Sequence, residues 1–85
     1  MAFKKYQEDI YVAVLDKRDF MGGNVIITTT NNVTEVVFYR TKIAVIDHNK
    51  KTVHYDNGGY TNAATTARIN AVKAACEDHF YYKVV

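Results

Sequence analysis

A cysteine and a histidine stand three residues apart near the end of the chain and together could form a nucleophile and its base. Cys76 and His79 would lie on adjacent turns of one face if this segment is helical. Cys76, however, belongs to an apolar stripe, in which a free cysteine behaves as a small hydrophobic side chain. No third group that would orient the histidine is evident in the sequence. We therefore interpret Cys76 as a core residue and predict that the protein is not an enzyme.

Two histidines and two aspartates flank one expected hairpin and are the types of residue that bind metal ions. They are Asp47, His48, His54 and Asp56. A zinc site needs three or four converging ligands with a recognisable spacing, and here only His54 and Asp56 are expected to share a strand face. The polarity of turns explains these residues more simply. We predict no metal and no cofactor.

The stretch DNGGYTNAATTARIN, residues 56–70, places two glycines and a tyrosine before an expected helix. A helix N-terminus attracts anions, so Gly58 to Asn62 could hold one. The glycines nevertheless lack the spacing of phosphate-binding loops. We interpret the stretch as the corner between a sheet and a helix. Tyr60 is then expected to pack beneath the helix start, and Asn62 to be the N-cap.

Five residues are candidates for contact with a partner: Arg40, Lys42, Tyr81, Tyr82 and Lys83. The first two are expected on one face of a strand, where they interrupt an apolar row. Inward charges can prevent unwanted strand pairing, which is the interpretation we favour, or they could face a phosphate backbone or an acidic protein. The last three combine tyrosines with a cation, a composition enriched at protein interfaces. They could equally form a fifth strand.

The composition restricts the kinds of protein that this chain can be. Its 85 residues are enough for a single domain spanning residues 1–85, and 48% apolar with 24% charged residues is typical of a globular protein. No segment approaches the roughly 20 apolar residues that span a bilayer, so no membrane partner is expected. One lone cysteine fits a reducing cytoplasm. The net charge of +2 arises from interspersed signs, unlike the basic stripe of a nucleic-acid-binding protein.

The pattern of β-branched and apolar residues predicts four strands followed by one helix. The strands are expected at residues 9–15, 25–30, 33–47 and 51–56, with a loop at 16–24 and a helix at 63–80. Asn31 and Asn32 suit a tight hairpin turn, because asparagine tolerates positive φ. That turn pairs Ile27 with Val36 and Val25 with Phe38. A second turn at residues 49–50 pairs Ile46 with Val53 and Ala44 with Tyr55.

These registers place apolar residues on both faces of the sheet. One face collects Val25, Ile27, Val36, Phe38, Ala44, Ile46, Val53 and Tyr55, and the other collects Ile26, Val37, Tyr39, Ile43 and Val45. The helix can cover only one face, with a stripe formed by Thr65, Ile69, Val72, Cys76 and Phe80. The other face must be covered by the N-terminal segment, by the C-terminal tail, by a second copy of the chain in a homodimer, or by a partner. The predicted fold class is α+β: a four-stranded, mainly antiparallel sheet with one long C-terminal helix packed on one face.

The chain also resembles a group of small bacteriophage-encoded proteins with the pattern T-x-I … GG[YW] … T-x-x-R-I-N. The matching residues are Thr41, Ile43, Gly58, Gly59, Tyr60, Thr65, Arg68, Ile69 and Asn70. Asn62 and Ala64 stand where those proteins tend to have further threonines. The resemblance covers about thirty residues and brings no enzymatic residues. It implies an accessory protein of a phage or prophage that acts inside an infected bacterium.

Two functions therefore compete. The first is a non-enzymatic phage accessory protein in the host cytoplasm that binds and inhibits a bacterial protein complex. An anti-CRISPR protein bound to a CRISPR–Cas effector, or another anti-defence inhibitor, is its most concrete form. The second is a small nucleic-acid-binding protein that uses Arg40, Lys42 and exposed tyrosines for charge and stacking. The mixed charge of the chain favours the first.

Overall fold

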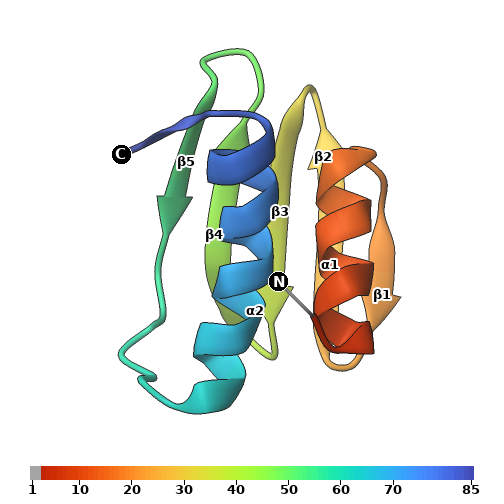
Figure 1. Cartoon of the computed structure of the whole chain (residues 1–85), viewed down its shortest axis with the longest axis vertical. Coiled ribbons are helices and arrows are strands. Elements are labelled where there is room, and N and C mark those ends of the chain that lie inside the picture. Colours follow the sequence, from red (N-terminus) through yellow and green to blue (C-terminus); the bar gives the residue numbers. More distant parts are fainter. Residues whose placement is uncertain (1–2) are drawn as a thin grey trace.

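The computed structural model describes residues 3–85 and shows, over that range, a six-stranded sheet with two helical segments packed on one of its faces (Figure 1). The elements, in chain order, are α1 (Lys5–Leu15), β1 (Phe20–Gly22), β2 (Val25–Thr30), β3 (Val33–Phe38), β4 (Thr41–Asp47), β5 (Thr52–Tyr55), α2 (Ala63–Lys73), the π-helix η1 (Ala74–His79) and β6 (Lys83–Val84). The strands lie in sequence order, antiparallel except for β5 and β6. The α+β class is confirmed, whereas four strands and one helix were too few.

The first element is a helix, so the strand predicted at residues 9–15 was wrong. Its buried residues are Ile10, Ala13 and Val14, which are three and four positions apart and therefore lie on one helical face. The backbone N–H of Lys4 donates to Gln7 Oε1 (3.1 Å), which satisfies one free amide at the helix start. The β-branched residues favoured a strand locally, but burial of this face against the sheet stabilises the helix.

Both hairpin registers predicted from the turns are confirmed. Asn31 and Asn32 have φ values of 52° and 65°, the positive pair that a two-residue hairpin turn requires. The pairs Val25–Phe38 and Ile27–Val36 join β2 to β3, and the pairs Ala44–Tyr55 and Ile46–Val53 join β4 to β5. The connection from β4 to β5 is longer than the predicted two-residue turn, since it extends from residue 48 to residue 51.

The long strand predicted at residues 33–47 is in fact a hairpin, because the chain reverses at Tyr39 and Arg40. Tyr39 has a φ of 57°, a conformation that is uncommon for a residue other than glycine. The register between β3 and β4 shifts beyond the Val36–Ala44 pair, which leaves Ile43 as an extra residue in β4. Ile43 was predicted on the opposite face, but this bulge buries it in the core beside Ala44.

Two further elements complete the sheet at its edges. The segment predicted as a loop at residues 16–24 contains β1, which pairs with β2 around a turn at Gly23 and Asn24. In the C-terminal tail, β6 lies parallel to β5. Of the three tail residues, Lys83 lies in this strand and Tyr81 and Tyr82 precede it, so the interpretation of the tail as a strand is confirmed only for Lys83.

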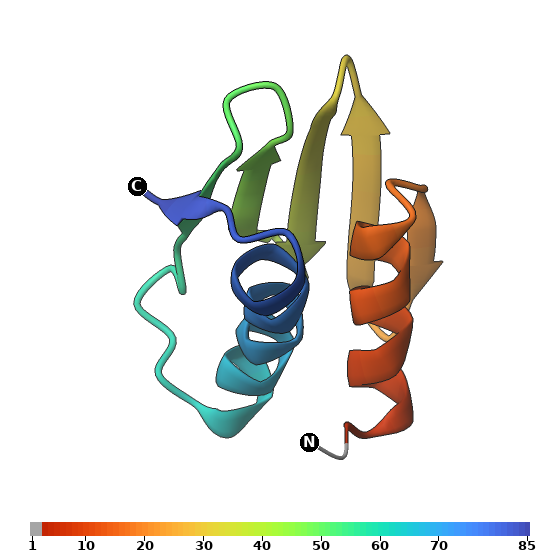
Figure 2. The ribbon, with the colours of Figure 1, turned by 45° about the horizontal axis from the view of Figure 1, so that its top comes forward.

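The predicted helix at residues 63–80 exists, but its second half is a π-helix. Asn62 caps it as expected, since its Oδ1 accepts a hydrogen bond of 2.9 Å from the backbone N–H of Thr65. The helical segment α2–η1 packs beside α1 (Figure 2). Its buried residues are Thr65, Ala71, Val72, Ala75 and Cys76.

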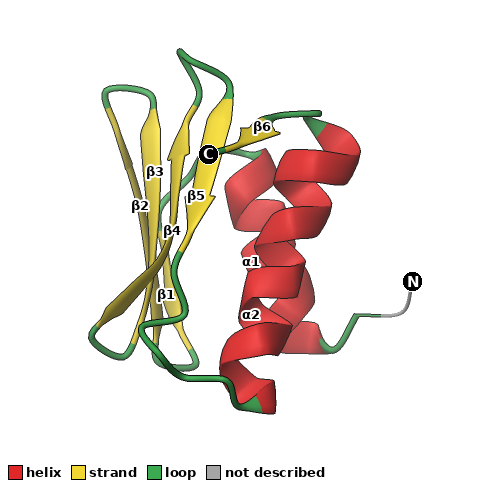
Figure 3. Cartoon of the chain, turned by 90° about the vertical axis from the view of Figure 1, so that its left-hand side faces the viewer, coloured by secondary structure: helices red, strands yellow, loops and turns green. Residues whose placement is uncertain are grey.

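All helical segments cover the same face of the sheet, so the opposite face, here called the outer face, is uncovered by any part of the described chain (Figure 3). The N-terminal segment forms α1 on the helical side, and the C-terminal tail forms an edge strand. Neither covers the outer face, although both were candidates for that role. Within residues 3–85, no helix combines the length and the apolar character needed to cross a bilayer.

Candidate functional site

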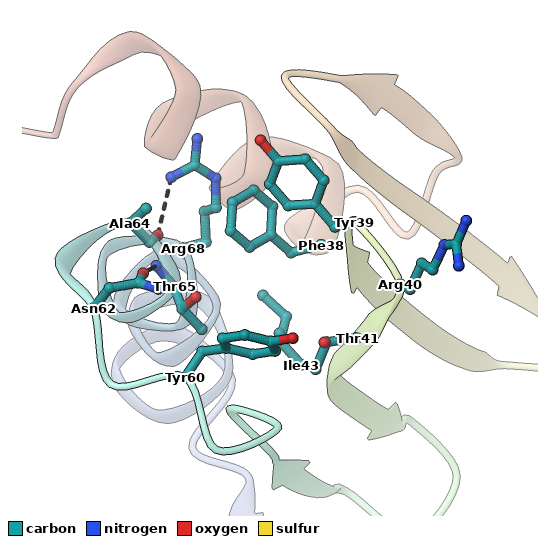
Figure 4. A pocket seen from close by; sticks show the side chains of 10 residues that line it. All are labelled: Phe38, Tyr39, Arg40, Thr41, Ile43, Tyr60, Asn62, Ala64, Thr65 and Arg68. Atoms are coloured by element: carbon teal, nitrogen blue, oxygen red, sulfur yellow. Dashed lines mark hydrogen bonds between the residues drawn. The ribbon is translucent and has the colours of Figure 1, made fainter.

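A cavity of about 560 Å³ opens where the β3–β4 hairpin meets the start of α2 (Figure 4). We call it the hairpin cavity. Its lining residues are Phe38, Tyr39, Arg40, Thr41, Ile43, Tyr60, Asn62, Ala64, Thr65 and Arg68. They come from two segments that are about twenty residues apart in sequence, residues 38–43 and 60–68, which only the folded chain brings together. Its volume lies within the range of small-molecule binding sites, roughly 300–1,000 Å³.

The hairpin cavity has an apolar floor and aromatic rims. Phe38 and Ile43 are buried beneath it, whereas Tyr39 and Tyr60 are 66% and 57% exposed. Tyr60 was predicted to pack beneath the helix start, and the structure instead places it at the cavity wall, where its ring lies near Thr41 (Figure 4). Two exposed rings beside an apolar floor can stack on a flat ligand.

The loop before α2 approaches the hairpin closely because it contains Gly58. This residue has a φ of +62°, and a Cβ atom placed on it would lie 2.7 Å from Thr41 Cγ2. The backbone N–H of Gly58 donates to Asp56 Oδ1 (2.7 Å), and that of Gly59 donates to Asn57 Oδ1 (2.9 Å). The corner predicted between sheet and helix is therefore confirmed, and it also positions Tyr60 at the cavity.

Arg68 places a fixed positive charge beside the hairpin cavity. Its Cζ lies 4.3 Å from the ring centroids of both Tyr6 and Phe38, so the guanidinium is held between two aromatic rings. Its Nη1 donates to the carbonyl oxygen of Ala64 (2.9 Å). Its Nε is buried without a hydrogen-bond partner among the described residues. The side chain is consequently pre-organised by packing from α1 and β3.

The second cation of the hairpin cavity is Arg40, and its environment is different. It is exposed in the hairpin turn, and its side chain points away from the cavity (Figure 4). The residues that line the cavity include these two arginines and no carboxylate. The cavity wall therefore carries a net positive charge and suits a ligand with an anionic group.

Met21, Ile26 and Val37 on the outer face, together with Tyr39 in the adjoining hairpin turn, form what is here called the apolar patch. Met21, Ile26 and Val37 occupy one cross-strand row over β1, β2 and β3. Met21 is 78% exposed and Ile26 is 41% exposed. Tyr39 and Arg40 line both the hairpin cavity and a second hollow of about 440 Å³, which Met21 and Ile26 also line. The patch and the cavity are thus neighbours on either side of the hairpin turn.

The five predicted partner-binding residues fall into two groups at opposite ends of the sheet. Arg40 was predicted on a strand face but lies in the hairpin turn. Lys42 lies on the outer face near the start of β4, and its Nζ is 3.1 Å from Glu35 Oε2. Lys83 pairs with Thr52 at the far end of β5. Tyr81 is exposed, and the Tyr82 hydroxyl forms a hydrogen bond with His48 (2.8 Å). The structure therefore does not bring the five residues into one surface.

The Cys76–His79 pair does not form a nucleophilic site. Cys76 is fully buried, and burial, together with the nearby Glu77 carboxylate, raises the pKa of its thiol to about 12. His79 is exposed at the end of η1. A thiol in this environment stays protonated at neutral pH, so it is a core side chain, as predicted.

The residues considered as metal ligands each serve a separate structural role. His48 is buried between the hydroxyl groups of Thr34 and Tyr82. The Asp47 carboxylate accepts backbone hydrogen bonds in the β4–β5 connection, and His54 Nδ1 contacts the carbonyl oxygen of Val85. Over residues 3–85, no three His, Cys, Asp or Glu side chains converge as a metal site would require.

Sequence reasoning did not identify the hairpin cavity, and it identified the apolar patch only in part, since Ile26, Val37 and Tyr39 were placed on a second apolar face but Met21 was not. A signal for the cavity did exist, because five of the residues that carried the phage resemblance line it: Thr41, Ile43, Tyr60, Thr65 and Arg68. Met21 gave no signal, since it was placed in a loop until the structure showed β1.

Comparisons with known proteins agree with the phage resemblance. No curated protein and no solved structure matched the chain. One protein family did match, described as Kyanoviridae Gp96 protein, and the match extends over residues 3–85. Because this match covers nearly the whole chain, the protein belongs to the Kyanoviridae Gp96 family and is a small phage protein.

Proposed function

We propose that this protein is a non-enzymatic phage accessory protein that binds and inhibits a protein complex in the cytoplasm of the bacterial host. Its most concrete form is an anti-defence inhibitor, such as an anti-CRISPR protein that binds a CRISPR–Cas effector. Membership of a phage family supports the accessory role. The single observation that supports binding to a protein is the apolar patch on the outer face.

The apolar patch has the composition of a protein interface. Interfaces are enriched in Met, Tyr and other large apolar side chains at their centre, with polar residues at the rim. Met21, Ile26 and Tyr39 are all exposed, and the ion pair between Lys42 and Glu35 lies beside Val37 on the same face. An exposed apolar patch of this kind lowers the solubility of a protein unless a partner buries it.

A second candidate function is nucleic-acid binding, which Arg40 beside the exposed ring of Tyr39 supports. An aromatic side chain next to a cation can stack on a base and contact its phosphate. Lys42, which was expected to add to this charge, is paired with Glu35. The outer face consequently lacks a continuous basic stripe, and the protein-binding function is favoured.

The test compares tagged wild type with a Met21→Asp/Ile26→Asp variant in host lysate that contains CRISPR–Cas machinery. Tyr81→Asp is the matched control, because Tyr81 is also exposed but lies at the far end of the sheet. The lysate is treated with nuclease, and bound proteins are washed at low and high salt. A stoichiometric protein retained at high salt by wild type and by Tyr81→Asp, and lost by the double variant, is the expected result.

Inhibition is measured in parallel as the efficiency with which CRISPR–Cas clears a targeted plasmid. Wild type and Tyr81→Asp should reduce clearance, and the double variant should not. Recovery of nucleic acid alone, lost at high salt, would overturn the proposal and favour the second function. A second copy of the chain could also bury the patch, and sedimentation of the purified protein tests for such a homodimer. A homodimer that is lost in the Met21→Asp/Ile26→Asp variant would also overturn the proposal.

A further inference from the structure

We propose that the hairpin cavity is a nucleotide-binding site, which takes a nucleobase between its aromatic rims and a phosphate group beside Arg40. This site shares Tyr39 with the apolar patch, but Met21, Ile26 and Val37 do not line it, and the inference does not depend on the proposed function. The inference is based on the volume, the aromatic walls, the polar groups and the charge of the cavity.

The dimensions and walls of the cavity suit a flat ring. Its volume of about 560 Å³ exceeds what one amino-acid side chain occupies, and it is partly open to solvent. The exposed rings of Tyr39 and Tyr60 line it, and the buried side chains of Phe38 and Ile43 form its floor. A nucleobase presents two π faces, and stacking on an aromatic side chain stabilises it regardless of which base it is.

Polar groups at the wall distinguish this cavity from a simple apolar anchor site. Thr41, Asn62 and Thr65 contribute two hydroxyl groups and an amide around the apolar floor. A few polar groups placed in a mostly apolar cavity are typical of small-molecule sites, in which they orient the ligand. A base edge offers donors and acceptors to such groups, whereas an aliphatic side chain from a protein would leave them unpaired.

The charge of the cavity indicates an anionic ligand. Arg40 and Arg68 line it, and no Asp or Glu does. The guanidinium of Arg68 is held between Tyr6 and Phe38, so it contributes a fixed field. Arg40 is exposed at the opening, and the structure shows its side chain directed outward (Figure 4). Rotation of this side chain would bring a planar fork of donors to a phosphate, the geometry that arginine favours.

The test titrates the ¹⁵N-labelled protein with AMP, GMP, CMP and UMP and records amide chemical shifts by NMR. At least one mononucleotide should bind with a Kd below about 1 mM, and the shifted amides should cluster at residues 38–43 and 60–68. The matching nucleoside should bind more weakly, because it lacks the phosphate. A short single-stranded oligonucleotide shows whether the ligand is a free nucleotide or a nucleic-acid strand. The ligand is a free nucleotide if the oligonucleotide binds no more tightly than the mononucleotide, and a strand if it binds much more tightly.

Two pairs of variants locate the site. Tyr60→Ala should weaken binding at least about fivefold through lost stacking, whereas Tyr81→Ala, the same change at an exposed tyrosine far from the cavity, should not. Ala64→Glu should abolish binding, because it adds a carboxylate at the cavity wall, and Ala64→Gln is its neutral control. Glu is favourable in the first turn of a helix and can pair with Arg68 four residues later, so this variant should stay folded.

The proposal is overturned if no mononucleotide or oligonucleotide binds with a Kd below about 1 mM. It is also overturned if the shifted amides lie outside residues 38–43 and 60–68, or if Tyr81→Ala weakens binding as much as Tyr60→Ala. Equal binding by Ala64→Glu and Ala64→Gln would be a further contradiction. These outcomes do not decide the protein-binding proposal, since its test changes Met21 and Ile26, which do not line the hairpin cavity.

Discussion

His48 and Tyr82 share a hydrogen bond of 2.8 Å between the imidazole Nδ1 and the phenolic oxygen, although 34 residues separate them in sequence. On the other side of the ring, Nε2 lies 2.8 Å from the hydroxyl of Thr34. The imidazole therefore connects the C-terminal tail to β3 in the interior of the protein. Burial lowers the pKa of His48, the charge of Lys17 lowers it further, and Asp47 opposes both effects.

The stability of the protein should fall as the pH drops below about 6.5. The pKa of His48 is lower in the folded protein than its ordinary value of 6.5, so at lower pH the unfolded chain binds a proton that the folded chain does not. The contribution of neutral His48 is thus fully present above about pH 6.5 and decreases as the pH falls through the folded pKa. Urea unfolding at several pH values between about 5 and 8 measures this slope.

A variant that cannot titrate at this position separates His48 from other groups. His48→Gln should be less stable than wild type at pH 8, since Thr34 and Tyr82 lose a well-placed partner. Its unfolding free energy should nevertheless change less between about pH 5 and 6.5 than that of wild type. Identical slopes for the two proteins would contradict the assignment to His48.

Arg68 should contribute measurably to folding stability. Its guanidinium packs between the rings of Tyr6 and Phe38, so Arg68→Ala should lower the free energy of unfolding by about 2 kcal/mol. The control is Lys73→Ala, because Lys73 is exposed and its Nζ lies 5.5 Å from the Tyr55 ring centroid. The control should change stability by less than about 0.5 kcal/mol. Chemical denaturation measures both, and equal effects would show that the double stack is unimportant.

Two glycine substitutions should differ in cost although both residues have positive φ. Gly23→Ala, at φ +58° with open space around it, should cost about 1 kcal/mol from backbone strain alone. Gly58→Ala, at φ +62°, adds a Cβ that would lie 2.7 Å from Thr41 Cγ2, so it should cost about 2–3 kcal/mol. Thermal unfolding compares the two variants. A smaller loss for Gly58→Ala would mean that the loop moves away from the hairpin without cost.

The thiol of Cys76 should be unreactive in the native protein. It is fully buried, and the pKa of about 12 keeps it protonated, whereas alkylating and disulfide reagents require an accessible thiolate. Treatment with iodoacetamide at about pH 8 should leave native Cys76 unmodified, and mass spectrometry should show complete labelling after unfolding in guanidinium chloride. Rapid labelling of the native protein would indicate that η1 opens readily.

Several features of the fold were predictable because local chemistry determines them. Asn31 and Asn32 specify a tight turn by tolerating positive φ, and the strand pairing on either side of that turn follows from the two-residue alternation. Asn62 is the N-cap because its short amide side chain reaches the amide of Thr65. The alternation of apolar residues also predicted correctly that most of one sheet face would be buried.

The errors lie where tertiary packing outweighs local preference. Residues 9–15 are rich in β-branched side chains, yet burial of Ile10, Ala13 and Val14 on one face makes the segment helical. Tyrosine is not a residue type that is typical of a tight turn. Tyr39 nevertheless adopts positive φ, because β3 and β4 pair on either side of it. The bulge at Ile43 is likewise a product of packing, because it turns the Ile43 side chain into the core between the sheet and the helices.

The turn at Asn31 and Asn32, the helix cap, two hairpin registers and the resemblance to phage proteins were predictable from the sequence, because each depends on residues close together in the chain. That α1 and α2 cover the same face, and so leave Met21 and Ile26 uncovered, was evident only from the folded chain. The same is true of the cavity that residues 38–43 and 60–68 enclose. Both depend on how helices pack against a sheet, and that packing minimises the exposed apolar area of the whole chain at once, which no local window of sequence contains.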